Sequence, residues 1–150
     1  MIGLFSTAGL MLGAILVTSG APLEHHAKVD HASGSVEARY TGTVHLVPRQ
    51  VGSPAPGGRP STLRCEWSAN LSVDREARHE AGGLLSRSIV DTDSLKLTRS
   101  GWCNSQRTSV VAEIAARSDE LKERLVAIAT EDRSALLAQV ERQNEQRTAA

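Results

Sequence analysis

Large aromatic side chains are scarce in this sequence of 150 residues, in which Phe, Tyr and Trp together make up only 3%. The one Phe lies within the first twenty residues, which leaves Tyr40, Trp67 and Trp102 for the rest of the chain. Because each aromatic ring buries about 150–250 Å², the core has to be built mainly from Leu, Val, Ile and Ala. Such a core is thin for a domain of about 130 residues, and a covalent cross-link would add to its stability.

An excess of charge of either sign is also absent, since 17 Lys and Arg residues balance 17 Asp and Glu residues. A dedicated nucleic-acid-binding protein carries a basic surface, so we expect no nucleic-acid partner. The charged fraction of 23% is close to the average for globular proteins, and it predicts a folded domain rather than a disordered chain.

The common catalytic and nucleotide-binding motifs, G-x-S-x-G, G-x-x-x-x-G-K-[ST] and G-x-G-x-x-G, do not occur in the sequence. His79 and Glu80 begin an H-E-x-x-H zinc motif, but Gly83 occupies the place of the second histidine. We therefore predict that the protein is not an enzyme and needs no cofactor. An alternative is a small hydrolase in which His79 and Glu80 act with Asp91 or Asp93 as acid and base, which requires these side chains to meet in one cleft.

Residues 1–20 contain no charged side chain, and the run from 2 to 17 is almost wholly apolar. This pattern is typical of a signal peptide that is removed after export, although the usual Lys or Arg before the apolar run is missing. The alternatives are a buried helix and a membrane anchor, but the apolar run falls short of the roughly 20 residues that cross a bilayer. We expect a periplasmic or extracellular protein with no stable membrane span after cleavage.

Only two cysteines are present, Cys65 and Cys103. In an oxidising compartment such a pair predicts a disulfide, whereas in the cytosol it would be two buried thiols. The two residues do not form a C-x-x-C motif, so a redox-active pair is not expected. We also expect Trp67 and Trp102, which lie beside the two sulfurs, to line the same small core.

Residues 21–34 are mostly polar and predict a flexible tail. This segment contains the densest cluster of imidazole and carboxylate groups in the chain: Glu24, His25, His26, Asp30 and His31. Imidazole nitrogens bind Zn²⁺, Cu²⁺ and Ni²⁺, so His25, His26 and His31 are candidate metal ligands. The opposing interpretation is a solvated tail that binds metal weakly, because an unstructured chain loses entropy when it chelates an ion.

Alternation of apolar and polar residues predicts strands over about 35–47, 62–74 and 84–99. The polar residues 91–94 interrupt the third of these, which is then either one extended strand or two short strands joined by a hairpin turn. Between the first two strands, the Pro- and Gly-rich residues 52–60 predict a loop.

Apolar residues recur at helical spacing after Cys103, and no Gly or Pro occurs from 106 to 146. The pattern predicts a helix over about 105–146, which would be about 60 Å long if it were straight. Thr130, Glu131 and Asp132 have the composition of a helix N-terminus, so the helix can break near 130. Alternatively, one continuous helix pairs with a second copy, although Asp132 would then occupy a core position of the heptad.

Strands followed by a helix predict the α+β class: a small antiparallel sheet of three or four strands and a long C-terminal helix or helix pair, in one domain over 35–147. We expect an exported, non-enzymatic domain that binds another protein or an envelope component through its sheet face or its C-terminal helix. Exposure of Leu136, Leu137 and Val140 would make them candidate partner-binding residues and would favour a homodimer. The alternative function is a periplasmic metal-binding or metal-sensing protein that uses the three histidines.

Overall fold

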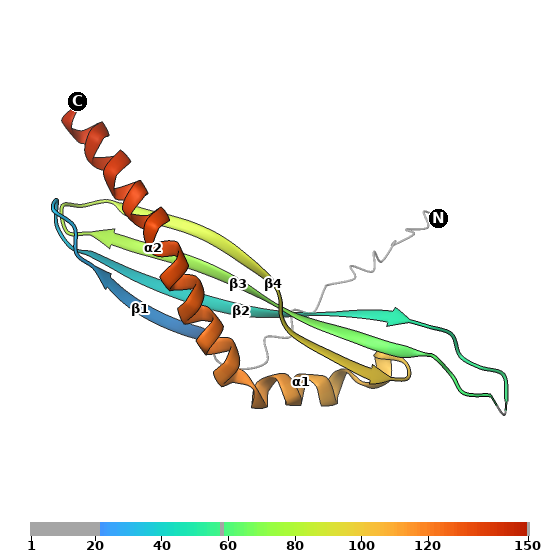
Figure 1. Ribbon diagram of the computed structural model, residues 1–150. Coiled ribbons are helices and arrows are strands. Elements are labelled where there is room, and N and C mark those ends of the chain that lie inside the picture. Colours follow the sequence, from blue (N-terminus) through green and yellow to red (C-terminus); the bar gives the residue numbers. More distant parts are fainter. Residues whose placement is uncertain (1–21, 58, 150) are drawn as a thin grey trace, which may run out of the picture.

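The computed structural model describes residues 22–57 and 59–149, so the signal peptide predicted over 1–20 lies outside the described residues. The fold is a four-stranded antiparallel sheet, ordered β1-β2-β3-β4, followed by helices that pack on it (Figure 1). The elements are β1 (Leu23–Val29), β2 (Val36–Val51), β3 (Arg64–His79), β4 (Leu84–Ser100), the 3-10 turn η1 (Cys103–Ser105), α1 (Arg107–Ala116) and α2 (Ser118–Thr148). The predicted α+β class is confirmed.

Strand β3 forms the centre of the core because every second residue from Cys65 to His79 is buried. This alternation arises from the strand itself, in which successive side chains point to opposite faces. Strand β2 does the same from Val36 to Gly42, and it pairs with β3 along its whole length. The inner faces of these two strands carry the apolar residues that the sequence predicts for them.

The prediction of a flexible tail over 21–34 is wrong for half of this segment, because residues 23–29 form the edge strand β1. Its residues pair with 36–42 of β2, from Leu23 opposite Gly42 to Val29 opposite Val36. Leu23, Ala27 and Val29 alternate toward the core, and Val29 is buried. This apolar face packs on the core, and pairing with β2 supplies the backbone hydrogen bonds of a strand whose outer face is polar.

Strand β4 is continuous over Leu84–Ser100, which agrees with one strand over 84–99 and not with the alternative of two short strands. The polar residues 91–94 form a bulge instead of a hairpin turn, since Leu71 pairs with Asp91 and Ala69 with Leu95. Asp93 adopts a left-handed conformation with φ of 55°, which Asp tolerates better than most residues. Its backbone N–H donates to the side-chain oxygen of Asn70 at 2.9 Å.

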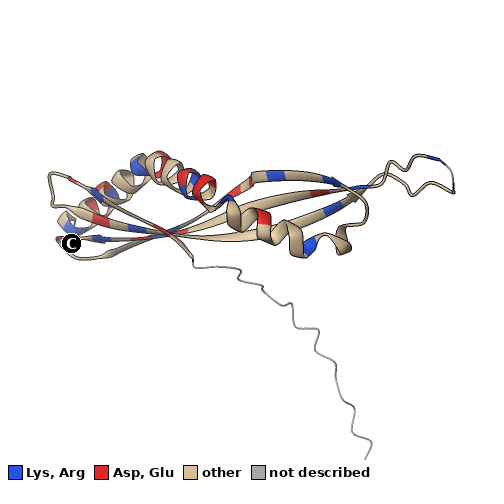
Figure 2. Ribbon diagram, turned by 90° about the horizontal axis from the view of Figure 1, so that it is seen from below, with Lys and Arg blue, Asp and Glu red and all other residues tan. Residues whose placement is uncertain are grey.

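The helical layer breaks at Arg117 rather than near 130, and α2 runs without interruption through Asp132. The sheet twists along its length, so α1 and α2 cover different halves of it and point in different directions (Figures 1 and 2). Val110 and Ile114 of α1 pack with Trp67 and Cys65, whereas α2 packs on the half that contains β1. One straight helix could not follow both halves of the twisted sheet.

A disulfide joins Cys65 of β3 to Cys103 of η1, with 5.0 Å between their Cα atoms. This bond ties the start of the helical layer to the central strand, as the sequence predicts. The two tryptophans beside it differ, because Trp67 is 2% exposed and Trp102 is 52% exposed. The expectation that both indoles line one core is therefore wrong for Trp102, which faces solvent.

Candidate functional site

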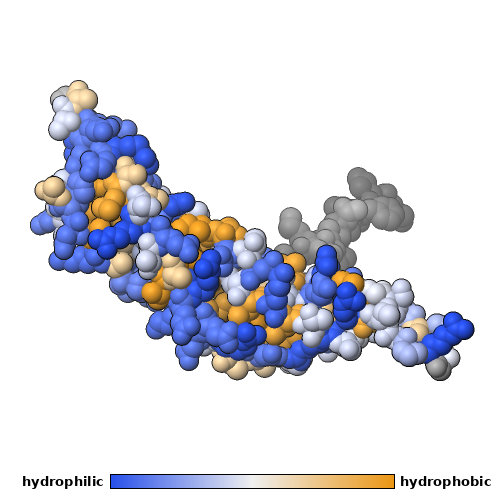
Figure 3. All heavy atoms as spheres, in the orientation of Figure 1, coloured by the Kyte–Doolittle hydropathy of each residue, from blue (hydrophilic) through white to orange (hydrophobic). Residues whose placement is uncertain are grey.

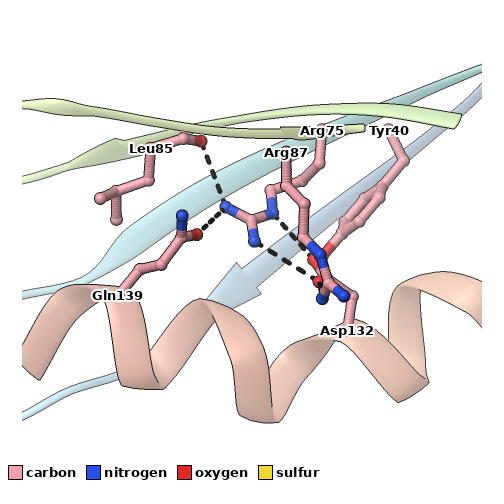
Figure 4. A network of polar contacts seen from close by, with 6 residues as sticks. All are labelled: Tyr40, Arg75, Leu85, Arg87, Asp132 and Gln139. Atoms are coloured by element: carbon pink, nitrogen blue, oxygen red, sulfur yellow. Dashed lines mark hydrogen bonds and ion pairs between the residues drawn. The ribbon is translucent and has the colours of Figure 1, made fainter. Parts of the chain in front are cut away.

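The most densely connected polar group of the molecule lies between the sheet and α2 (Figure 4). Asp132 of α2 accepts hydrogen bonds from the Tyr40 hydroxyl at 3.0 Å and from Nε of Arg75 at 2.8 Å. Its other carboxylate oxygen accepts from Arg87 at 2.5 Å. Arg75 donates further to Gln139 of α2 at 2.6 Å and to the Leu85 carbonyl at 3.3 Å. The network thus connects β2, β3 and β4 to one helix.

Burial decides what this network can do. The side chains of Arg75 and Asp132 are 0% and 1% exposed, so each would be a costly isolated charge without the other. Burial by itself raises the pKa of Asp132, but hydrogen bonds from Arg75, Arg87 and Tyr40 outweigh it and hold that pKa below its ordinary value. Burial and the neighbouring Asp132 raise the pKa of Tyr40. The carboxylate of Asp132 accepts four hydrogen bonds, one from Tyr40, two from Arg75 and one from Arg87, which fill its acceptor positions. We therefore interpret the network as a set of contacts that fixes α2 on the sheet.

A second carboxylate bridges the sheet and α2 at the β4 bulge. Asp91 accepts two hydrogen bonds from Arg124, at 2.7 and 2.9 Å, and a third from the Ser94 hydroxyl. The hydrogen bond from Arg124 is the main reason that the pKa of Asp91 lies below its ordinary value, against the effect of burial. Both acidic links to α2 therefore depend on ionised carboxylates.

Acid should weaken the folded state through these two residues. The pKa values of Asp91 and Asp132 are lower in the folded protein than in the unfolded chain, so the unfolded chain binds protons more readily. Their contribution to stability is complete above about pH 5 and is lost progressively as the pH falls through about 4 and below. Urea unfolding measured from pH 7 to pH 3 should show a falling midpoint, and an Asp132→Asn variant should show a shallower fall. A midpoint independent of pH would contradict this assignment.

The three candidate metal-ligating histidines do not come together. His25 and His26 are neighbours on a strand, so His25 faces the core side next to Tyr40 and His26 faces the opposite side, 3.9 Å from Glu24. His31 lies beyond the strand and bonds to Glu141. Among residues 22–57 and 59–149, no group of three or more His, Cys, Asp or Glu side chains is arranged to hold a metal ion.

His31 instead belongs to a chain of polar contacts at the end of the sheet. Its Nε2 lies 2.5 Å from Glu141 of α2, and its Nδ1 lies 2.7 Å from the hydroxyl of Ser33. The same hydroxyl lies 3.1 Å from Nε2 of His79, whose buried Nδ1 has no hydrogen-bond partner in the described structure. The order of a carboxylate, an imidazole and a serine is also that of a hydrolase triad.

The backbone around Ser33 does not support that chemistry, because acyl transfer needs free N–H groups to bind an oxyanion. The N–H of Ser33 donates to Nδ1 of His31, and the N–H of Gly34 donates to the His31 carbonyl. The N–H of Ser35 donates to the Glu80 carboxylate. We therefore interpret the contacts as a clasp that ties the turn between β1 and β2 to β3 and α2.

The alternative hydrolase set of His79, Glu80 and Asp91 or Asp93 does not share a cleft either. The carboxylate of Glu80 accepts hydrogen bonds from the N–H and the hydroxyl of Ser35, and these bonds lower the pKa of Glu80. Asp91 lies on β4 away from His79 and accepts a hydrogen bond from Arg124. In register, Asp91 pairs with Leu71 of β3, eight positions before His79.

The residues predicted to bind a partner on the C-terminal helix are part of the core. Leu136 and Val140 are 0% exposed, and Leu137 is partly buried against the same cluster. They face the sheet because α2 lies across it, so the apolar stripe of the helix is already covered within one chain. A dimer formed through these three residues would require α2 to leave the sheet.

The outer face of the sheet, opposite the helices, carries an open hollow near β1. Its lining includes four basic side chains and two glutamates: His26, Lys28, Arg39, Arg78, Glu37 and Glu76. Register places Glu37 between Lys28 and Arg78, and Arg39 lies 3.4 Å from Glu76. Figure 2 shows that charges of both signs are interspersed along the strands and α2. In the hollow itself, basic groups outnumber acidic ones.

Sequence reasoning missed the central network and the exposed indole. Arg75 lies 57 positions from Asp132 in the sequence, so no local pattern could join them. The one available signal was Asp132 itself, an acidic residue at a position where the helical stripe calls for an apolar one. For Trp102, Ser100 and Gly101 before it and Asn104 and Ser105 after it indicate a turn, where an aromatic side chain is less easily buried.

The family models, the curated proteins and the solved structures that we compared with this chain gave no match. Among the described helices, none combines the length and the apolar character that a membrane span requires. The function therefore has to be inferred from the surfaces of the molecule.

Proposed function

We propose that this chain is an exported, non-enzymatic domain that binds another protein through the outer face of its sheet. The support is the way in which the helices are used. Leu136 and Val140 of α2 are buried on the inner face, so the helix has no free apolar stripe for a partner. Figure 3, from the side on which α2 crosses the sheet, shows a mainly hydrophilic surface with small hydrophobic patches.

The hollow on the outer face is the observation that carries this proposal. It gathers Lys28, Arg39 and Arg78 on a rigid sheet, where cross-strand pairing fixes their spacing. Neither Lys28 nor Arg78 has a carboxylate within ion-pair distance in the described part of the chain, so both remain available. Complementary charge steers partners and sets specificity, and a basic hollow fits an acidic patch on the partner protein.

Charge reversal in the hollow tests the proposal. A photo-crosslinking amino acid at Thr41, on the same face two residues from Arg39, should form an adduct with the partner in the cell of origin. Reversing Lys28→Glu and Arg78→Glu together should reduce that adduct at least tenfold. The matched control, Arg133→Glu with Arg142→Glu on the exposed side of α2, makes the same change in net charge and should leave the adduct unchanged. No adduct, or equal loss in both double variants, would contradict a partner at the outer face.

Export is the other half of the proposal, and the disulfide between Cys65 and Cys103 supports it because such bonds persist mainly in oxidising compartments. Intact mass spectrometry of the protein from its native cell, with and without thiol alkylation, reports the N-terminus and the thiol state together. We expect loss of about the first twenty residues and no alkylated cysteine. Recovery of the full chain with two alkylated thiols would contradict export.

A further inference from the structure

We infer that Trp102 anchors a second interaction surface, at the opposite end of the strands from the hollow, and that this surface binds an acidic segment of another protein. Trp102 is 52% exposed, whereas Tyr40 and Trp67 are buried. A chain with so few aromatic residues leaves one of them in water. Trp and Arg are the residues most enriched among those that dominate binding energy in protein interfaces.

The backbone on both sides of Trp102 is held in place. The N–H of Gly101 donates to the Leu63 carbonyl at 3.0 Å, and the Gln50 side-chain amide donates to the Gly101 carbonyl at 3.1 Å. The oxygen of the same Gln50 amide accepts from the N–H of Cys103 at 2.8 Å, and Cys103 is fixed by the disulfide. A side chain on a fixed backbone loses less conformational freedom on binding, which favours tight association.

The end of the molecule that carries Trp102 is basic. Residues 47–57, 59–68 and 97–113 contain only two acidic residues against five arginines: Arg49, Arg59, Arg64, Arg99 and Arg107. Both acidic residues are already paired, Glu66 with Arg49 and Arg64, and Glu113 with Arg99. Arg59 and Arg107 have no carboxylate within 4.0 Å in the part of the chain that the structure describes. Because arginines outnumber acidic residues at this end of the molecule, the surface of a partner that complements it is acidic.

An acidic protein segment fits this surface better than an anionic bilayer does. A peripheral protein enters a bilayer through several apolar side chains, but the described residues of this end expose only two large ones, Val47 and Trp102. A single indole among arginines matches instead a segment that offers one pocket or apolar side chain and several carboxylates. This surface is separate from the hollow near β1, so either proposal can fail without the other.

Crosslinking beside Trp102 tests the inference in the full chain, expressed in its own cell. A photo-crosslinking amino acid at Asn104, an exposed position two residues from Trp102, leaves the indole in place and should form an adduct whose crosslinked peptide carries a net negative charge. The same amino acid at Val126, an exposed apolar position on α2, should not. Absence of an adduct at 104, or a neutral or basic crosslinked peptide, would overturn the inference.

Binding of the crosslinked segment, made as a synthetic peptide, should then weaken at least tenfold with Trp102→Ala and with Arg64→Glu, since Arg64 lies opposite Ser100 in the register of β3 and β4. Arg142→Glu, an equal change in charge on α2, should leave the dissociation constant unchanged. Unchanged binding in the first two variants would overturn the inference. In a parallel arm, vesicles of phosphatidylglycerol should not shift the emission of Trp102, obtained as the difference between the native chain and Trp102→Ala. A blue shift without a protein adduct would assign this surface to the membrane and overturn the inference as well.

Discussion

Replacing Asp132 with Ala should cost about 3–5 kcal/mol of unfolding free energy, the range for breaking a buried ion pair by removal of one partner. The reason is what the substitution leaves behind. Arg75 has a fully buried side chain, and without Asp132 its charge keeps only Gln139 and the Leu85 carbonyl as partners. Tyr40 loses its acceptor at the same time. Because single domains are stable by only about 5–15 kcal/mol, this loss brings the protein close to unfolding.

Urea denaturation followed by circular dichroism measures the effect, and Glu123→Ala is the matched control. Glu123 is exposed on the same helix and makes no ion pair within the described chain, so its removal should change stability by less than about 0.5 kcal/mol. A double variant, Arg75→Met with Asp132→Leu, should recover most of the stability, since it removes both charges. A cost below 1 kcal/mol for Asp132→Ala would mean that the network does not hold the helix.

The sequence predicts the helical layer only in part. The spacing of apolar residues is enough to predict a long helix. A break near 130 is one of the alternatives that the sequence leaves open, because Thr130, Glu131 and Asp132 have the composition of a helix start. In the structure, Asp132 is instead buried among arginines of β3 and β4. The actual break at Arg117 follows from the twist of the sheet, a property of the assembled fold that no local pattern contains.

The strands show the same division between local and long-range information. Alternation was sufficient for β2 and β3, where one face is fully buried. It failed for β1, where histidines and charged residues outnumber Leu23, Ala27 and Val29, because pairing with β2 supplies hydrogen bonds that the segment cannot make alone. The candidate surfaces were harder still, since the basic hollow joins residues of three strands and the exposure of Trp102 depends on how the chain turns after β4.

Removal of the disulfide is the second substitution with a large expected effect. The double variant Cys65→Ala with Cys103→Ala should lose about 4 kcal/mol, because the bond closes a loop of about 38 residues and restricts the unfolded chain. The bond also joins β3 to η1, directly before α1. The loss should therefore appear as a lower urea midpoint with reduced protection of α1 from hydrogen exchange.

Two comparisons separate the cross-link from other effects of the substitution. Reduced native protein has the same thiol side chains without the bond, so its stability should lie close to that of the double variant. The difference in unfolding free energy between the reduced protein and the double variant measures the effect of the smaller side chains. The difference between the oxidised and the reduced protein measures the effect of the disulfide bond. If oxidised and reduced native protein unfold at the same urea concentration, the disulfide does not stabilise this domain.

We propose that α2 is a fixed layer on the inner face of the sheet, which leaves the outer face and the Trp102 end for partners. Hydrogen exchange of backbone amides at pH 7 tests this most directly, because amides in docked elements exchange only through large openings. We predict that the amides of residues 125–140 in α2 are as strongly protected as those of β3. Fast exchange of these helix amides while β3 remains protected would contradict the account.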